Sequence, residues 1–306
     1  MMILKLVVTK LWIGRNMEKL ISIIGLTSSG KSGLGIELAK IFNGEIVSAD
    51  SRQVYIGLDW CSGKVTREEL GEVKHHLIDV QNLGEQFTLF NFQKQAYAAI
   101  DDIIARGKVP FLVGGTGLYS RSVVEGYDLV SERPDEDLRR ELEKLSKDEL
   151  VEICRKEQIE IPDEITARRL IRLIELKRNP KPENKPRYEV LQIGISWPKE
   201  EIHERIRLRL EMRMPHMIEE IKSLLASGVD KQFLMSLGLE AKFIIKFLDG
   251  EFKDYHEFFE LLFTQERQFA KRQRTWQAKE KNTIWIDGGE NLFENAKRII
   301  EKFLKK

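Results

Sequence analysis

One octapeptide near the start of the chain limits the possible folds more than any other feature. It reads Gly-Leu-Thr-Ser-Ser-Gly-Lys-Ser over residues 25–32 and fits the pattern G-x-x-x-x-G-K-[ST]. The apolar run Leu20–Ile24 before it predicts a buried strand, and the segment Ser32–Phe42 after it predicts an amphipathic helix that Asn43 and Gly44 end. A strand, a glycine-bearing loop and a helix form the context in which this pattern makes a phosphate-binding loop, or P-loop.

The chemistry expected of this loop follows from its residue types. Glycines let backbone N–H groups turn toward phosphate oxygens, and the helix presents its N-terminus to the same anion. Lys31 would reach the terminal phosphates, and the Ser32 hydroxyl would be a ligand of Mg²⁺. The predicted phosphate-binding residues are Gly25, Leu26, Thr27, Ser28, Ser29, Gly30, Lys31 and Ser32. The pattern, common in nucleotide-binding and ATP-binding proteins, leaves open an ATP kinase, an ATPase and a transferase of a diphosphate-activated group.

Further apolar runs indicate the fold class. Strands are expected at Glu45–Ser48, Val109–Val113, Val190–Ser196 and Thr283–Ile286, and helices at Phe92–Ala105 and Leu292–Leu304. Long helical patterns follow the strand at Val190–Ser196 and continue to Arg274, with breaks expected at Pro215, Gly228, Gly238 and Gly250. Strands and helices that alternate with short connections are typical of a parallel sheet. We therefore expect an α/β fold with a P-loop NTPase-like core, a parallel sheet flanked by helices.

The charge pattern indicates a separate segment inside this core. The whole chain carries 50 Lys and Arg against 49 Asp and Glu, a net charge of +1. Leu118–Ile165 contains 15 acidic and 8 basic residues, whereas Thr166–Arg187 contains 8 basic and 2 acidic ones. The overall balance thus hides a local basic surface that would suit a nucleic acid. We predict a mainly helical insertion over 126–187, a core over 17–125 and 188–306, and an extension over 1–16.

Two further segments are expected to face the P-loop. The carboxyl ends of parallel strands meet at one edge of a sheet, where α/β proteins bind their ligands. Asp50 follows the predicted strand Glu45–Ser48, and the sequence GGTGLY over 114–119 follows Val109–Val113. The Asp50 carboxylate could bind metal or act as a base, and the Thr116 hydroxyl could donate to a phosphate oxygen. A catalytic site is therefore predicted at this edge.

Composition excludes several classes of protein. An apolar fraction of 42% and a net charge near zero argue against a disordered chain. No run reaches the ~18–20 apolar residues of a membrane span, and the two cysteines, Cys61 and Cys154, cannot build a disulfide scaffold or a multi-cysteine zinc site. His75 and His76 are adjacent and would point in opposite directions on a strand, so a structural or substrate-orienting role is expected rather than a metal site. We expect a cytoplasmic monomer that does not enter a membrane.

Taken together, six motifs resemble those of the tRNA dimethylallyltransferases, also called tRNA isopentenyltransferases. They read GLTSSGKS, SADSRQVY, HHLID, GGTGLY, RRLIRLIEL and FAKRQRTW and extend from Gly25 to Trp276. The resemblance implies transfer of a dimethylallyl group from dimethylallyl diphosphate to N6 of adenine 37, in the anticodon stem-loop of tRNAs that read codons beginning with U. It also implies that the P-loop holds diphosphate with Mg²⁺ as the cofactor.

The same resemblance implies roles for individual residues. Asp50 would take the proton of the N6 amine, while Thr27 and Thr116 would contact oxygens of the leaving diphosphate. Arg205 and Arg209 would contact substrate. The target adenine must leave its stack to reach a deep site, so we expect it to be flipped out. Residues expected to contact tRNA are Asp50, Ser51, Arg52, Gln53, Thr116, Arg139, Arg168, Arg169, Leu170, Ile171, Arg172, Arg267, Gln268, Lys271, Arg272 and Gln273.

Some positions depart from the family pattern. Leu26 stands where the family usually has Pro, Ile56 replaces a basic residue, and Leu237–Glu240 replaces I-G-Y-[KR]. Two other functions also agree with the P-loop. A small-molecule or nucleoside kinase would turn over ATP. A non-catalytic RNA-binding protein would keep its whole function after Asp50→Ala.

Overall fold

The computed structural model describes residues 17–129, 136–162, 165–178, 184–280 and 282–306. The extension expected at residues 1–16 lies outside these ranges. The chain divides into two compact units. The larger consists of the described residues up to Val124 and of Arg187–Lys306, and the smaller is Glu125–Pro186.

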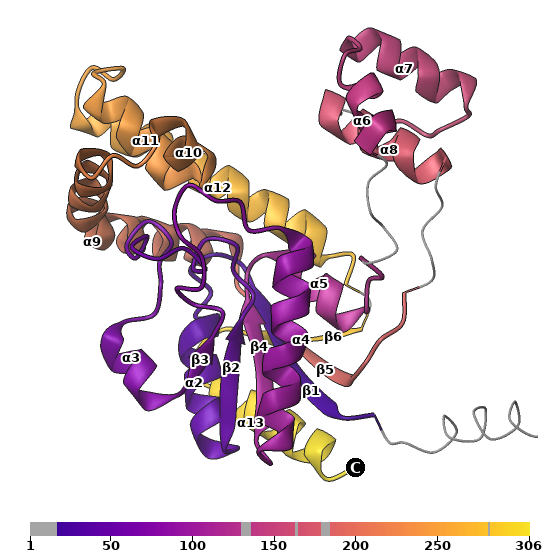
Figure 1. Ribbon diagram of the computed structural model, residues 1–306. Coiled ribbons are helices and arrows are strands. Elements are labelled where there is room, and N and C mark those ends of the chain that lie inside the picture. The colour runs from indigo at the N-terminus through magenta and orange to yellow at the C-terminus, as the bar shows by residue number, and fades with distance from the viewer. Residues whose placement is uncertain (1–16, 130–135, 163–164, 179–183, 281) are drawn as a thin grey trace, which may run out of the picture. The chain divides into compact units, whose positions relative to one another are not determined.

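Six parallel strands form the sheet of the larger unit (Figure 1). They are β1 (Lys19–Gly25), β2 (Gly44–Ser48), β3 (His75–His76), β4 (Val109–Gly114), β5 (Glu189–Ser196) and β6 (Thr283–Asp287). Their spatial order is β3-β2-β4-β1-β5-β6, and Ile23 of β1 aligns with Val113 of β4 and Ile193 of β5. The central strands read as unbroken apolar runs because helices cover both faces. The predicted α/β class with a parallel sheet is confirmed.

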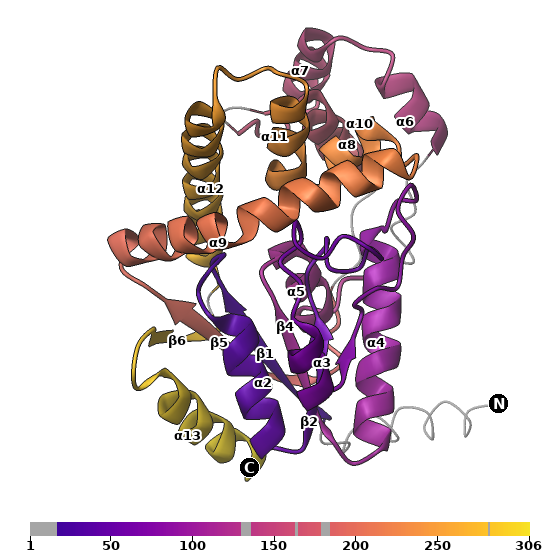
Figure 2. The ribbon, with the colours of Figure 1, turned by 90° about the vertical axis from the view of Figure 1, so that its left-hand side faces the viewer.

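Alternate residues of each strand pack against different helices. Leu20, Val47 and Leu112 share a core with α4 (Leu89–Ala105) and α5 (Gly117–Val124). Ile21, Ile46 and Phe111 share another with α2 (Lys31–Ile41) and α13 (Leu292–Leu304). Figures 1 and 2 show these two helix pairs on opposite faces of the sheet. The strand period of two residues therefore determines which helix each side chain meets.

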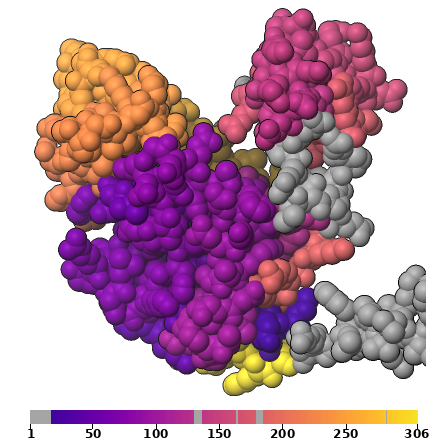
Figure 3. Space-filling view, viewed as in Figure 1, coloured from indigo at the N-terminus to yellow at the C-terminus, as the bar shows by residue number. Residues whose placement is uncertain are grey.

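Four helices lie across the carboxyl edge of the sheet (Figure 2). They are α9 (Lys199–Ala226), α10 (Lys231–Ser236), α11 (Leu239–Leu248) and α12 (Tyr255–Gln277). In the space-filling view the orange helices rest directly on the purple N-terminal half of the unit (Figure 3). Buried side chains such as Met217 and Phe258 belong to the same core as those of α4 and α5. These helices therefore form one wall of a ligand site at the carboxyl edge of the sheet.

The break expected at Pro215 does not occur, because Pro215 lies inside the single helix α9. Proline in a helix interior removes a hydrogen bond and costs about 3 kcal/mol. Met214, Met217 and Ile221 on this helix are fully buried, and burial of each such side chain contributes about 1.5–3 kcal/mol. Tertiary packing thus outweighs the local preference. The breaks expected at Gly228, Gly238 and Gly250 fall between helices.

The two-residue strand β3 was not predicted from sequence, since it is too short to give a pattern. His75 pairs with Ile46 at the edge of the sheet. The ring of His76 contacts the carboxylate of Glu45 at 2.8 Å, and Lys108 donates to the same carboxylate at 2.9 Å. Arg106 donates to both oxygens of this buried group. His76 therefore belongs to an ion cluster at the edge of the sheet, whereas the ring of His75 contacts the carbonyl oxygen of Val73 at 2.7 Å.

The smaller unit contains α6 (Glu136–Leu142), α7 (Lys147–Lys156) and α8 (Ala167–Arg178) around a core of its own. Leu170 and Ile171 of α8 are 0% and 7% exposed in that core. Their side chains pack toward the neighbouring helices α6 and α7, and the expectation that these two residues contact tRNA stays a prediction. The exposed residues Arg168 and Arg169 precede them on the same helix. Across the described part of the chain, no helix is both long and apolar enough to cross a membrane.

Candidate active site

The loop between β1 and α2 has the backbone shape that anion binding requires. Gly30, the residue before α2, is left-handed with φ of 88°, a conformation that glycine adopts without strain. No side chain caps the helix at this point, so its first N–H groups are available to a ligand. At Gly25 a Cβ would lie 2.5 Å from the Ser29 hydroxyl oxygen, so a larger residue there would displace this side chain.

Lys31 extends across this loop toward the turn after β4. Its Nζ donates to the carbonyl oxygen of Leu26 at 3.2 Å. A Cβ on Gly115 would come within 3.3 Å of the same nitrogen. Burial and, to a smaller extent, the charge of Arg209 lower the pKa of Lys31 to about 8, and the charge of Asp50 opposes this shift. A bound phosphate would restore the lost stabilisation of the ammonium group, so this lysine is adapted to an anion.

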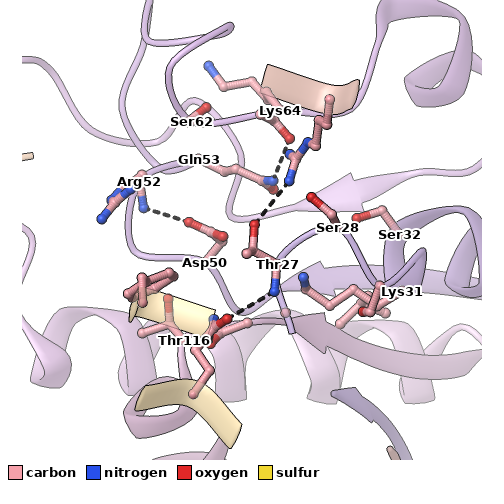
Figure 4. Close-up of a pocket in the computed structure, with 18 of the residues that line it drawn as sticks. Thr27, Ser28, Lys31, Ser32, Asp50, Arg52, Gln53, Ser62, Lys64 and Thr116 are labelled. Carbon is pink, nitrogen blue, oxygen red and sulfur yellow. Dashed lines mark hydrogen bonds between the residues drawn. The ribbon is translucent and has the colours of Figure 1, made fainter. Parts of the chain in front are cut away.

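Hydrogen bonds hold the turn after β2 against the turn after β4. The Thr116 hydroxyl accepts from the backbone N–H of Ser51 at 3.1 Å, and the Thr116 N–H donates to the carbonyl of Ala49 at 3.2 Å. Asp50 accepts from the N–H of Arg52 at 2.9 Å, which closes a turn around its own side chain. Figure 4 shows Asp50, Thr27 and Thr116 around one space. The sheet edge thus places a carboxylate opposite the phosphate loop.

Side chains from α9 and α12 form hydrogen bonds with the P-loop. Arg205 donates to the Ser28 carbonyl at 2.9 Å, and Arg209 donates to the Thr27 hydroxyl at 3.3 Å. Gln273 accepts from the N–H of Thr27 at 2.9 Å and donates to the Gly115 carbonyl at 3.3 Å. Helices far along the chain therefore fix the conformation of the P-loop.

These elements enclose a cavity of about 810 Å³ (Figure 4). Of the residues predicted from sequence, the cavity is lined by Thr27, Ser28, Ser29, Gly30, Lys31, Ser32, Asp50, Ser51, Arg52, Gln53, Thr116, Arg205, Arg209, Arg272 and Gln273. Gly25 and Leu26 shape the loop without lining the cavity.

The remaining predicted residues lie elsewhere. Arg267, Gln268 and Lys271 line a second cavity of about 500 Å³, together with Lys199, His203 and Arg274. In the smaller unit, Arg139 and Arg172 both donate to Glu175, at 2.7 and 3.2 Å. Arg139 and Arg172 thus hold a buried carboxylate, whereas Arg168 and Arg169 are exposed.

Sequence reasoning did not assign several residues that line the larger cavity. Apolar ones include Leu208, Met212, Phe269 and Trp276, and acidic ones include Glu240 and Glu266. Leu208 and Met212 on α9 are four residues apart, and Glu266 and Phe269 on α12 are three apart, which fits one face of each helix. That pattern does not distinguish a face toward a core from a face toward a ligand.

Charged groups gather at one wall of this cavity. Arg52 binds Glu240 at 3.0 Å. The Glu266 side chain, 6% exposed, accepts no hydrogen bond from a described residue. Burial and the charge of Glu240 raise the pKa of Glu266 to about 8, although the charges of Arg52, Arg209 and Arg213 oppose the rise. Burial and the charge of Arg209 lower the pKa of Arg213 to about 10, and two of its nitrogens have no hydrogen-bond partner among the residues that the structure describes. Polar atoms of Glu266 and Arg213 at this wall therefore lack hydrogen-bond partners within the described part of the protein.

Comparison with known proteins agrees with this geometry. Residues 53–280 match the family model for IPP transferase. The chain is 40% identical to a tRNA dimethylallyltransferase 2 of Shewanella sediminis, over 92% of this chain and 97% of that one. It is 39% identical to a tRNA dimethylallyltransferase of Streptococcus agalactiae, over 94% and 98%. The solved tRNA isopentenylpyrophosphate transferase of Bacillus halodurans aligns over 94% of this chain and 96% of its own, with 33% identity and a TM-score of 0.71. On the matched model and these relatives, the chain belongs to the IPP transferase family.

Proposed function

We propose that this enzyme transfers a dimethylallyl group from dimethylallyl diphosphate to N6 of adenine 37 in the anticodon stem-loop of tRNAs that read codons beginning with U. The observation that carries the proposal is that Asp50 and the P-loop residues Thr27 to Ser32 line one cavity. A diphosphate site and a carboxylate base on opposite sides of one space suit attack by a neutral amine on an allylic diphosphate. The relatives' names supply the class of reaction.

The reaction assigns one task to each side of the cavity. The N–H groups at the start of α2 and the side chains of Lys31 and Arg209 would bind the diphosphate. The N6 lone pair would form a bond to the allylic carbon as the bond from that carbon to the diphosphate oxygen breaks. The oxygen would leave with the electron pair, and Asp50 would accept the proton that the amine loses. Donors fixed before the reaction would stabilise the growing negative charge.

The donor set is compatible with Mg²⁺. The hydroxyl of Ser32, at the start of α2, and the carboxylate of Asp50 both line the cavity, and Mg²⁺ prefers such oxygen ligands beside phosphate oxygens. We propose that Ser32 contributes to holding the ion. When bound, Mg²⁺ would offset charge on the leaving diphosphate.

The tRNA contacts are a second part of the proposal. Ser51, Arg52 and Gln53 line the cavity beside Asp50, where a flipped adenine would have to enter. The second cavity, lined by the basic side chains of Arg267 and Lys271, suits RNA phosphates. In the smaller unit, Arg168 and Arg169 are exposed and would bind phosphates in the same way. We propose that a single chain performs the whole reaction as a monomer.

One experiment tests the activity. The protein is incubated with an unmodified tRNA transcript, labelled dimethylallyl diphosphate and Mg²⁺, without ATP. We expect label in the tRNA and release of diphosphate. No transfer by folded protein that binds the tRNA would refute the proposal, and a requirement for ATP would favour a kinase.

The role of Asp50 has a sharper test. Asp50→Asn keeps the shape of the side chain but removes the base, so turnover should fall roughly 100-fold or more while tRNA affinity persists. Asp249→Asn, an exposed acidic residue after α11, serves as the matched control. Lost tRNA affinity with unchanged turnover of bound substrate would make Asp50 a docking residue instead.

A further inference from the structure

Glu266 of α12 is a buried acidic side chain that the mechanism above does not use. It is 6% exposed and lines the same cavity as Asp50 and the P-loop. Among the described residues no donor reaches its carboxyl group within hydrogen-bond distance, although Arg52 and Glu240 beside it bind each other. A buried carboxyl without a partner costs free energy unless something else satisfies it. Because the side chain lines the cavity, a ligand bound there can supply this partner.

The surroundings of Glu266 favour a flat aromatic ligand. Phe269 lies one turn later on α12 and lines the cavity too. The guanidinium groups of Arg52 and Arg272 lie 6.0 and 5.9 Å from its ring centre. Aromatic and guanidinium planes are the usual surfaces on which an unstacked base rests. A base on this surface would place its edge beside the carboxyl group of Glu266.

We propose that Glu266 is a specificity-determining residue that recognises the acceptor adenine, its carboxyl group donating a hydrogen bond to a ring nitrogen next to the amino group. The inference rests on the proposed function. In the proposed reaction the N6 amine faces Asp50, and the neighbouring ring nitrogens of adenine, N1 and N7, are acceptors. A carboxylic acid can donate to one of them, as the amide of Asn or Gln does to adenine.

The protonation state of Glu266 agrees with this role. Glu240 from α11 and burial both favour the neutral acid, and together they exceed the opposing effects of Arg52, Arg209 and Arg213, so the pKa lies near 8. At neutral pH the group therefore carries the proton that it would donate. Above about pH 8 the carboxyl group would lose this proton. The resulting carboxylate can only accept hydrogen bonds, so it could not bind a ring nitrogen that is itself an acceptor.

The first test uses the unaltered enzyme and changes the RNA. Anticodon stem-loops with 1-deazaadenine or 7-deazaadenine at the target position each lack one ring nitrogen but keep the amine. We expect one of the two to lose about tenfold in kcat/KM, the scale of one hydrogen bond. With Glu266→Ala, the same analogue should show no further loss relative to adenine. Equal turnover of adenine and both analogues would overturn the proposal.

The second test separates recognition from a structural role. Glu266→Gln keeps a donor and an acceptor without ionising, so kcat/KM for RNA should stay within about threefold of the unaltered enzyme. Measured at saturating donor, where bound diphosphate keeps Lys31 charged, the decline of kcat/KM above about pH 8 should disappear in this variant. Glu260→Gln, on the same helix outside the cavity lining, is the control. An unchanged decline in Glu266→Gln would refute the assignment, whereas failure of the unaltered enzyme to transfer would refute the proposed function itself.

Discussion

Gly114 is the last residue of β4, and we expect that the addition of a single methyl group at this position disturbs the active site. A Cβ at this position would lie 2.2 Å from the carbonyl oxygen of Ala49 and 2.7 Å from its Cα. Ordinary contacts between carbon and carbonyl oxygen are about 3.3 Å or longer, so Gly114→Ala must push these backbones apart by about 1 Å. Both partners are main chain, and no side-chain rotation can relieve the contact. Ala49 directly precedes Asp50, and its carbonyl accepts from Thr116, so the displacement reaches the proposed base.

We expect Gly114→Ala to reduce kcat about 100-fold, because misplacement of a reacting group by about 1 Å has that effect. Its free energy of unfolding should fall by about 1–3 kcal/mol, the usual cost of overpacking. Transfer of labelled dimethylallyl to tRNA gives the first quantity, and urea unfolding gives the second.

Gly71→Ala is the matched control. A Cβ on Gly71, in α3 (Arg67–Glu72), would meet no atom within 4 Å, and the residue lies outside the cavity lining. Replacement there should leave turnover unchanged and stabilise the protein by about 0.5–1 kcal/mol, because alanine favours a helix more than glycine. Full activity of Gly114→Ala with unchanged stability would show that the two turns tolerate separation and would refute the reasoning.

Two further predictions follow from titratable groups. Because the pKa of Lys31 in the free enzyme is about 8, the affinity for inorganic diphosphate, measured by calorimetry, should fall as pH rises through 8, and Lys31→Met should abolish this dependence; a flat profile for the unaltered protein would contradict it. Arg106, His76 and Lys108 hold the pKa of Glu45 far below its ordinary value of 4.5, so its contribution to stability is complete above that value and is lost as pH falls. Urea unfolding between pH 7 and 3 should therefore show a steeper loss for the unaltered protein than for Glu45→Gln, and parallel curves would exclude this role.

Much of the core was predictable because its signals are local. The apolar run before the P-loop became β1, and the helix expected at Leu292–Leu304 is α13 with the same bounds. A parallel sheet covered on both faces needs uninterrupted apolar strands, and this requirement appears directly in the chain as short runs between glycines. The expectation that Asp50 and Thr116 share the edge with the P-loop needed only the rule that parallel strands end on one side.

Other features depend on segments that are distant in the chain. Pro215 stays inside α9 because buried side chains on both sides of it outweigh a local penalty. Leu170 and Ile171 belong to a basic motif in the sequence, yet their side chains pack into the core of the smaller unit. A motif contains both residues that can contact a ligand and residues that hold them in place, and the sequence pattern alone does not distinguish the two.

The sequence by itself thus determined five of the six strands, the phosphate loop and the family to which its motifs point, since each is a short pattern with its own physical cause. Only the tertiary structure decided how α9 and α12 close the site. Gln273 reaches Thr27 across 246 positions of the chain. Glu266, surrounded by the same cavity wall, acquires a raised pKa that no isolated helix would give it. Burial and the charges of distant neighbours arise only from packing, and they determine what these side chains can do.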